Sequence, residues 1–115
     1  TLLSNTNPTE TDRLLQKSFL TNPVEASINA FLIDTGDQQV LVDTGAGTFF
    51  GSKLGGKLQT SLKAAGYTPN EIDAILLTHI HTDHSGGLVK AGQRVFPAAM
   101  LYVGKPDVDF LFDRA

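Results

Sequence analysis

The stretch THIHTDHSGG, residues 78–87, holds all three histidines of the chain and one of its aspartates within six consecutive positions. It directly follows the apolar run AILL, residues 74–77, which is typical of a strand buried on both faces. Neutral imidazoles and carboxylates are ligands of zinc and its first-row neighbours. The sequence therefore predicts a metal site at the carboxyl end of a buried strand, the edge at which open α/β sheets keep their functional sites.

The spacing within this stretch indicates two ions rather than one. Side chains at i and i+2 of an extended segment point the same way, so His79 and His81 can reach one ion together. Asp83 and His84 come after the chain turns, for which residues 85–87 supply small side chains, and they can face a second ion. Two ions roughly 3.5–4 Å apart lower the pKa of a bridging water towards about 7, which gives a hydroxide nucleophile. A metal-dependent hydrolase is the leading hypothesis, and histidines of an ordinary strand are the alternative.

Two motifs, in this order along the chain, resemble those of the metallo-β-lactamase fold superfamily. The first is the strand end LVDTG, residues 41–45, and the second is His-x-His-x-Asp-His, residues 79–84, followed by two glycines. The resemblance runs from about Ser27 to Val103. Within the superfamily the chain looks most like methyl parathion hydrolase and its relatives, through SFL at 18–20, NAFL at 29–32, VLVDTGAG at 40–47 and LKAAGY at 62–67.

The resemblance implies a role for each ligand-type residue. His79 and His81 would bind the first metal, Asp83 and His84 the second, and Asp83 would also orient the bridging hydroxide. The cofactor would be two divalent ions, zinc first, with manganese, iron or cobalt as alternatives. Members of the superfamily take a bridging aspartate and two more histidines from later in the chain, and no histidine follows His84 here. The site would therefore be incomplete, and this chain alone inactive.

Two further residues are expected to support the site without binding metal. Asp43 matches the aspartate of the first motif, which the family places just past a core strand, where it holds the metal loop by hydrogen bonds. Thr78 stands directly before the first histidine. The alternative for Asp43 is a plain turn aspartate before Thr44 and Gly45.

The resemblance also implies the fold: α/β (α+β), as the N-terminal half of an αββα sandwich, with a mixed β-sheet and helices on one face. A full domain of this kind needs more than twice this length, so residues 1–115 are expected to form a single truncated domain with residues 1–25 as an arm or loop. The opposite sheet face should be apolar. It would pack against the missing C-terminal half, or against a second copy in a homodimer.

Composition agrees with a globular chain and narrows the partners. Hydrophobic residues make up 41% and charged residues 18%, which is enough apolar material for a core. The formal charge of -3 and the scattered lysines and arginines argue against nucleic acid, so a small-molecule substrate is expected. No run approaches the ~18 apolar residues of a membrane span, so no membrane partner is expected. The absence of cysteine fits either redox compartment and leaves the localisation open between cytoplasm and periplasm.

Local patterns predict the elements that carry the motifs. Residues 26–34 and 39–43 should form two strands joined by a turn at 35–38, and residues 99–103 a later strand. A helix face of Leu54, Leu58, Leu62 and Ala65 ends at Gly66, and favours core packing over a ligand groove. Residues 68–71 have a capping-box pattern that begins a short helical turn. Pro106 should begin a helix with Val108, Leu111 and Phe112 turned inward.

Aromatic residues are the only clue to the substrate. Phe49 and Phe50 lie in a glycine-bounded segment, residues 47–51, placed to lean over the metal site and hold an apolar leaving group. Methyl parathion hydrolases accept aryl phosphotriesters in an aromatic cleft. Packing of the two rings in the core or a lid is the preferred interpretation.

Three classes of function remain. The first is a dinuclear hydrolase of a phosphotriester, lactone or related ester, with a glyoxalase II-like thioesterase of the same fold as an alternative. The second is an oxidoreductase of the same fold. Flavodiiron proteins carry glutamate where this chain has His81, which leaves the single-iron persulfide dioxygenases. The third is a metal-free binding protein, which four intact ligand positions disfavour.

Overall fold

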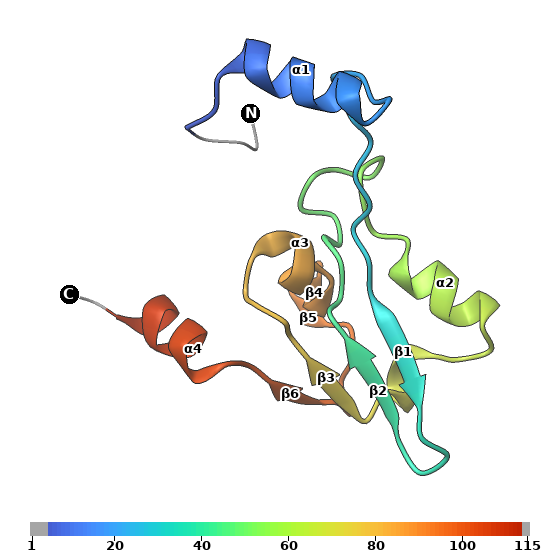
Figure 1. Ribbon diagram of the computed structural model, residues 1–115. Coiled ribbons are helices and arrows are strands. Elements are labelled where there is room, and N and C mark those ends of the chain that lie inside the picture. Colours follow the sequence, from blue (N-terminus) through green and yellow to red (C-terminus); the bar gives the residue numbers. More distant parts are fainter. Residues whose placement is uncertain (1–4, 114–115) are drawn as a thin grey trace.

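The computed structural model describes residues 5–113, in which the main element is one mixed β-sheet (Figure 1). Its strands are β1 (Phe31–Asp34), β2 (Gln39–Val42), β3 (Ala74–Leu76) and β6 (Met100–Tyr102), in the order β1-β2-β3-β6. β1 and β2 are antiparallel, whereas β2, β3 and β6 run parallel. A small hairpin of β4 (Val89–Lys90) and β5 (Gln93–Arg94) lies apart from the sheet. The predicted mixed α/β class is confirmed.

Helices and 3₁₀ turns precede, connect and follow the strands. They are α1 (Pro8–Lys17), α2 (Leu58–Ala64), the turn η1 (Pro69–Glu71), α3 (Thr82–Ser85), the turn η2 (Gly86–Leu88) and α4 (Lys105–Phe112). In Figure 1, α1 lies above the sheet at the end of the long segment that leads into β1, α4 lies to the left beyond β6, and α2 lies beside β1. None of the helices within residues 5–113 combines the length and apolar character needed to cross a membrane.

The core lies on the sheet face that α2 covers. Strand register brings Leu32, Leu41, Ile75 and Leu101 into one row across the four strands. Leu41 and Ile75 are buried, and Leu62 of α2 packs against them. Ile72 and Phe96 complete the buried cluster. The buried face therefore joins the strands that carry the two motifs to one helix.

The opposite sheet face is apolar and largely open. Its two rows are Phe31, Val42, Leu76 and Tyr102, and Ile33, Val40, Ala74 and Met100. Phe31 is 63% exposed, and Met100 is 62% exposed. Leu76 is also exposed, so the expectation that strand 74–77 is covered on both faces is wrong for the described residues. The expected unpartnered apolar face is present.

Local sequence explains how the chain enters β3. Gly66 ends α2 with φ of +91°, and the N–H groups of Gly66 and Tyr67 donate to the carbonyl groups of Lys63 and Leu62 at 3.0 and 2.9 Å. The Glu71 carboxylate then accepts hydrogen bonds from the N–H and the hydroxyl of Thr68, at 2.6 and 2.9 Å. These contacts confirm the predicted helix stop and the short capped turn.

Two predicted elements are shorter than expected. Residues 26–30 form no strand. Phe31 pairs with Val42 in the antiparallel register, so these residues would have to pair with the chain after Val42, which leaves the extended conformation at Asp43 with φ of +59°. Leu54 lies outside α2, because Gly55 and Gly56 separate it from the helix and Gly56 has a non-helical φ of +76°.

The two ends of the chain also differ from expectation. The N-terminal segment, expected as an arm or loop, contains the helix α1 at residues 8–17, because the Asn7 side chain accepts the N–H of Thr9 at 2.9 Å and Pro8 occupies the first turn. Residues 1–4 lie outside the described part. In α4, Val108, Leu111 and Phe112 are exposed, since nothing in residues 5–113 covers the face they form.

Candidate metal centre

Two neighbouring strands bring the candidate site together. β2 ends at Val42 and delivers Asp43, whose N–H donates to the Leu76 carbonyl of β3 at 2.9 Å. β3 then leads into the loop that carries Thr78 and His79, ahead of α3. Because β2 and β3 are parallel, their carboxyl ends meet at the same edge of the sheet. The two sequence motifs therefore face each other.

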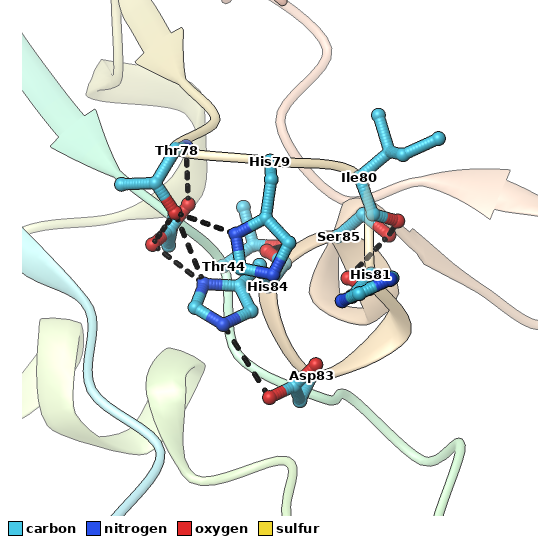
Figure 2. A network of polar contacts seen from close by, with 9 residues as sticks. Thr44, Thr78, His79, Ile80, His81, Asp83, His84 and Ser85 are labelled. Atoms are coloured by element: carbon cyan, nitrogen blue, oxygen red, sulfur yellow. Dashed lines mark hydrogen bonds and ion pairs between the residues drawn. The ribbon is translucent and has the colours of Figure 1, made fainter. Parts of the chain in front are cut away.

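The carboxylate of Asp43 is the centre of the polar network at this edge (Figure 2). Its Oδ1 accepts the backbone N–H of Thr78, and its Oδ2 accepts the Thr78 hydroxyl, both at 2.8 Å. Oδ2 also lies 2.8 Å from Nδ1 of His84. Burial raises the pKa of Asp43, but the hydrogen bonds from His84 and Thr78 together outweigh burial and leave the pKa below its usual value. Asp43 is thus an anion that joins both motifs.

His84 is held by its backbone as well as by its ring. The carbonyl of His84 accepts the N–H of Thr44 at 2.7 Å and the Thr44 hydroxyl at 2.8 Å. Thr44 is 1% exposed, so these donors have no access to water. The sequence predicted Thr44 only as a turn residue after Asp43. Its position directly after Asp43 is the signal that could have identified it as a support of His84.

The glycines after His84 serve close packing rather than a left-handed turn. Gly86 has φ of -63°, and Gly87 is not among the residues with positive φ. A Cβ on Gly86 would lie 2.3 Å from the carbonyl oxygen of Ala46, and one on Gly87 would lie 2.1 Å from that of Thr44. The turn expected at residues 85–87 is formed by the end of α3 and the 3₁₀ turn η2, and glycine also lets the two motif loops touch.

Three of the four predicted ligands form one group. Ligand atoms of His79, Asp83 and His84 all lie within 4.8 Å of one another, with Nε2 of His84 3.4 Å from Oδ2 of Asp83. His81 stands outside this group, and its ring lies 4.7 Å from that of His79 in an edge-on arrangement. In Figure 2, His79, Asp83 and His84 converge, whereas His81 lies to one side. Ser85 anchors that side through its hydroxyl, which donates to the carbonyl groups of Ile80 and His81 at 3.0 and 3.1 Å.

The chemistry of the donor set fits a divalent cation. A neutral His84 that donates from Nδ1 to Asp43 keeps an unshared electron pair on Nε2, the atom that faces Asp83. An imidazole nitrogen and a carboxylate oxygen 3.4 Å apart can both reach one ion. Metal-binding histidines commonly donate their other ring nitrogen to a carboxylate, which fixes the ring. His84 with Asp43 has this arrangement.

Comparison with known families identifies the superfamily of the chain. Residues 24–105 match the family model described as Metallo-beta-lactamase superfamily. The chain belongs to this superfamily. The match contains both motif loops and the whole four-stranded sheet.

Solved structures of this superfamily share the fold over nearly the whole chain. The crystal structure of the hydrolase AbOPH is 39% identical with a TM-score of 0.86, and covers 98% of this chain and 39% of that chain. The dizinc quorum-quenching lactonase AidC is 33% identical with a TM-score of 0.85, over 96% of this chain and 38% of that chain. The atrochrysone carboxyl ACP thioesterase of Passalora fulva is 37% identical over 69% of this chain and 22% of its own length. The chain thus spans well under half the length of these relatives.

Of the two packings expected for the phenylalanines, in the core or in a lid, the structure excludes the core. Phe49 and Phe50 are 66% and 44% exposed, and their rings meet edge to face with centroids 5.7 Å apart. They pack against each other on the loop after Asp43 rather than in the core.

Proposed function

We propose that the protein is a metal-dependent hydrolase of ester-type substrates. The observation that carries the proposal is the convergence of His79, Asp83 and His84 over the ionised carboxylate of Asp43. Membership of a superfamily of metal-dependent hydrolases supports it. The cofactor that we propose is two divalent ions with zinc first, in keeping with the dizinc lactonase among the similar structures.

Each residue has a proposed task. His79 and His81 hold one ion, and Asp83 and His84 hold the other. Asp43 and Thr78 orient the histidine rings by hydrogen bonds. When bound, the ions supply Lewis acidity towards water and towards a carbonyl or phosphoryl oxygen. Asp83 is the catalytic residue, because a carboxylate has two oxygens: one can bind metal while the other accepts a proton of the attacking water and orients it.

The proposed substrate is a phosphotriester, a lactone or a related ester with a good leaving group. This is the chemistry that a methyl parathion hydrolase-like member would perform, and the lactonase AidC is a structural relative. The exposed rings of Phe49 and Phe50 lie on the segment that follows Asp43 along the chain and offer an apolar surface for the leaving group. The net charge of -3 supports a small molecule rather than nucleic acid as the substrate.

We also propose that this chain corresponds to the first half of an αββα sandwich. The open apolar rows of the sheet and the exposed face of α4 support this, because such surfaces in a monomer usually mark an interface. Further metal ligands would then come from a second half, which corresponds to the part of the relatives that this chain does not match. A homodimer through the same face is the alternative.

A second candidate is a thioesterase. It is favoured by the identity of 37% to the atrochrysone carboxyl ACP thioesterase over 69% of the chain. The same donor set would serve, because a thioester carbonyl presents the same electrophilic carbon as an oxygen ester. The two candidates differ in the leaving group and not in the metal centre.

A substrate panel tests the proposal. The complete protein is stripped with a chelator and reloaded with zinc, manganese, iron or cobalt, and initial rates are measured on a nitrophenyl phosphotriester, an acyl lactone and an acyl thioester. We expect the protein to hydrolyse the phosphotriester or the lactone, and we expect this activity to be lost on chelation and restored by added metal. Preferred hydrolysis of the thioester would select the second candidate. Rates that survive complete metal removal would contradict both.

A further inference from the structure

The hydroxyl of Thr78 has three partners in the candidate site. Its Oγ1 lies 2.8 Å from Oδ2 of Asp43, and 3.2 Å from both Nδ1 of His79 and Nδ1 of His84. The backbone N–H of the same residue donates to Oδ1 of Asp43 at 2.8 Å. Thr78 is thus fixed at two points by one carboxylate and touches two of the three clustered ligands.

A proton count orders these contacts. A threonine hydroxyl has one proton to donate and two unshared pairs with which to accept. An ionised carboxylate only accepts, and bonds to it are stronger than bonds between neutral groups. The hydroxyl therefore donates to Asp43, the nearest of its partners. His84 also donates its Nδ1 proton to Asp43, which lies closer to that nitrogen, at 2.8 Å, than Thr78 does.

This order leaves the Thr78 oxygen as an acceptor for His79. The partner at 3.2 Å is Nδ1 of His79, so this nitrogen must carry the proton for the contact to be a hydrogen bond. We propose that Thr78 is a positioning residue that passes the orientation set by Asp43 on to His79, so that both His79 and His84 present an unprotonated Nε2 to the metal. The inference rests on the proposed function, because it assumes that the histidines bind metal, but the protonation of the rings can be measured whether or not the protein is a hydrolase.

Without the hydroxyl the two histidines should behave differently. His84 keeps its own bond to Asp43, whereas His79 loses its Nδ1 partner among the described contacts and can protonate either ring nitrogen. A His79 ring with its proton on Nε2 points a donor at the place where the ion should bind. Replacement of Thr78 should therefore weaken metal binding through one ligand only.

Nitrogen NMR on the metal-free protein tests this directly. The complete protein, labelled with ¹⁵N and freed of metal, is examined at about pH 8, where an ordinary imidazole is neutral. Long-range proton–nitrogen spectra show which ring nitrogen carries the proton. The wild type should have its proton on Nδ1 in both His79 and His84. In Thr78→Val, His79 should shift towards the Nε2-protonated form while His84 stays unchanged and reports that the site is folded.

Two more variants and one affinity measurement complete the test. Thr78→Ser keeps the hydroxyl and should retain the wild-type spectrum, as should Thr60→Val, the same replacement on the exposed side of α2. Calorimetry should give zinc binding weaker by about 10–100-fold for Thr78→Val. A wild-type His79 protonated on Nε2, a Thr78→Val protein that keeps the Nδ1 proton, or unchanged zinc affinity would overturn the inference. A protein with the expected spectra that hydrolyses nothing would overturn only the proposed function.

Discussion

Gly87 and Thr44 approach each other so closely that a Cβ on Gly87 would lie 2.1 Å from the carbonyl oxygen of Thr44. The N–H of Gly87 donates to the Gly45 carbonyl at 3.1 Å in the same contact. The loop after Asp43 and the loop after His84 are therefore joined backbone to backbone. This junction holds Asp43 and His84 in a fixed position relative to each other.

Gly87→Ala should disturb this junction. The added methyl meets backbone atoms that cannot move aside, so we expect a loss of unfolding free energy of at least about 1–3 kcal/mol, measured by urea denaturation. Gly104→Ala is the matched control: its Cβ would meet only Pro106 Cδ, at 3.9 Å, and its φ is -59°. We expect it to change stability by less than about 1 kcal/mol. Equal losses in the two variants would contradict the proposed contact.

Asp43→Ala should act through metal retention. Removal of the carboxylate leaves Nδ1 of His84 and both donors of Thr78 without their partner, so we expect zinc affinity to fall by about 10–100-fold. Activity should recover in part when zinc is added in excess. Asp37→Ala, in the exposed β1–β2 turn, is the control and should bind zinc as the wild type does. Undiminished affinity in Asp43→Ala would show that the carboxylate does not support the site.

Asp83→Ala should behave differently from Asp43→Ala. The Asp83 carboxylate faces Nε2 of His84 and is proposed both to bind metal and to orient the attacking water. We expect turnover to fall by about a hundredfold or more even with metal in excess. Steady-state rates measured across a zinc titration separate the two variants. Full rescue of Asp83→Ala by zinc would limit its role to metal binding.

The stability of the metal-free protein should depend on the ionisation of Asp43. Despite burial, hydrogen bonds lower the pKa of Asp43 in the folded protein. Its contribution to the free energy of unfolding is therefore complete above the pKa of the unfolded chain, about 4, and is lost as the pH falls through the pKa of the folded protein. Wild type should therefore lose stability more steeply than Asp43→Asn at acidic pH. Urea midpoints of both proteins, measured in chelator from neutral pH downwards, test this. Parallel curves would contradict the lowered pKa.

The sequence predicted the sheet well, and also the residues that contact the histidine loop, because both depend on local patterns. The apolar runs around Leu41 and Ile75 set the strands, and the helix stop at Gly66 and the capped turn at Thr68 follow from short-range hydrogen bonds. Asp43 and Thr78 were expected to lie at the histidine loop, and they contact it.

Long-range geometry explains what the sequence did not reveal. The role of Thr44 depends on a carbonyl forty residues away, and the role of Gly86 and Gly87 depends on the backbone of another loop. Leucine spacing alone placed Leu54 on α2, although two glycines separate it from the helix. The inward face expected for α4 requires a partner surface that residues 5–113 do not supply.

The most direct test of the metal centre is anomalous diffraction at the zinc absorption edge from crystals of the complete protein grown with zinc. We expect an ion about 2.0–2.2 Å from Nε2 of His84 and from a carboxylate oxygen of Asp83, with Nδ1 of His84 still hydrogen-bonded to Asp43. A second ion is expected beside His79 and His81. Zinc bound only elsewhere, or a His84 ring turned away from Asp43 in the loaded protein, would contradict the assignment of this cluster as a metal centre.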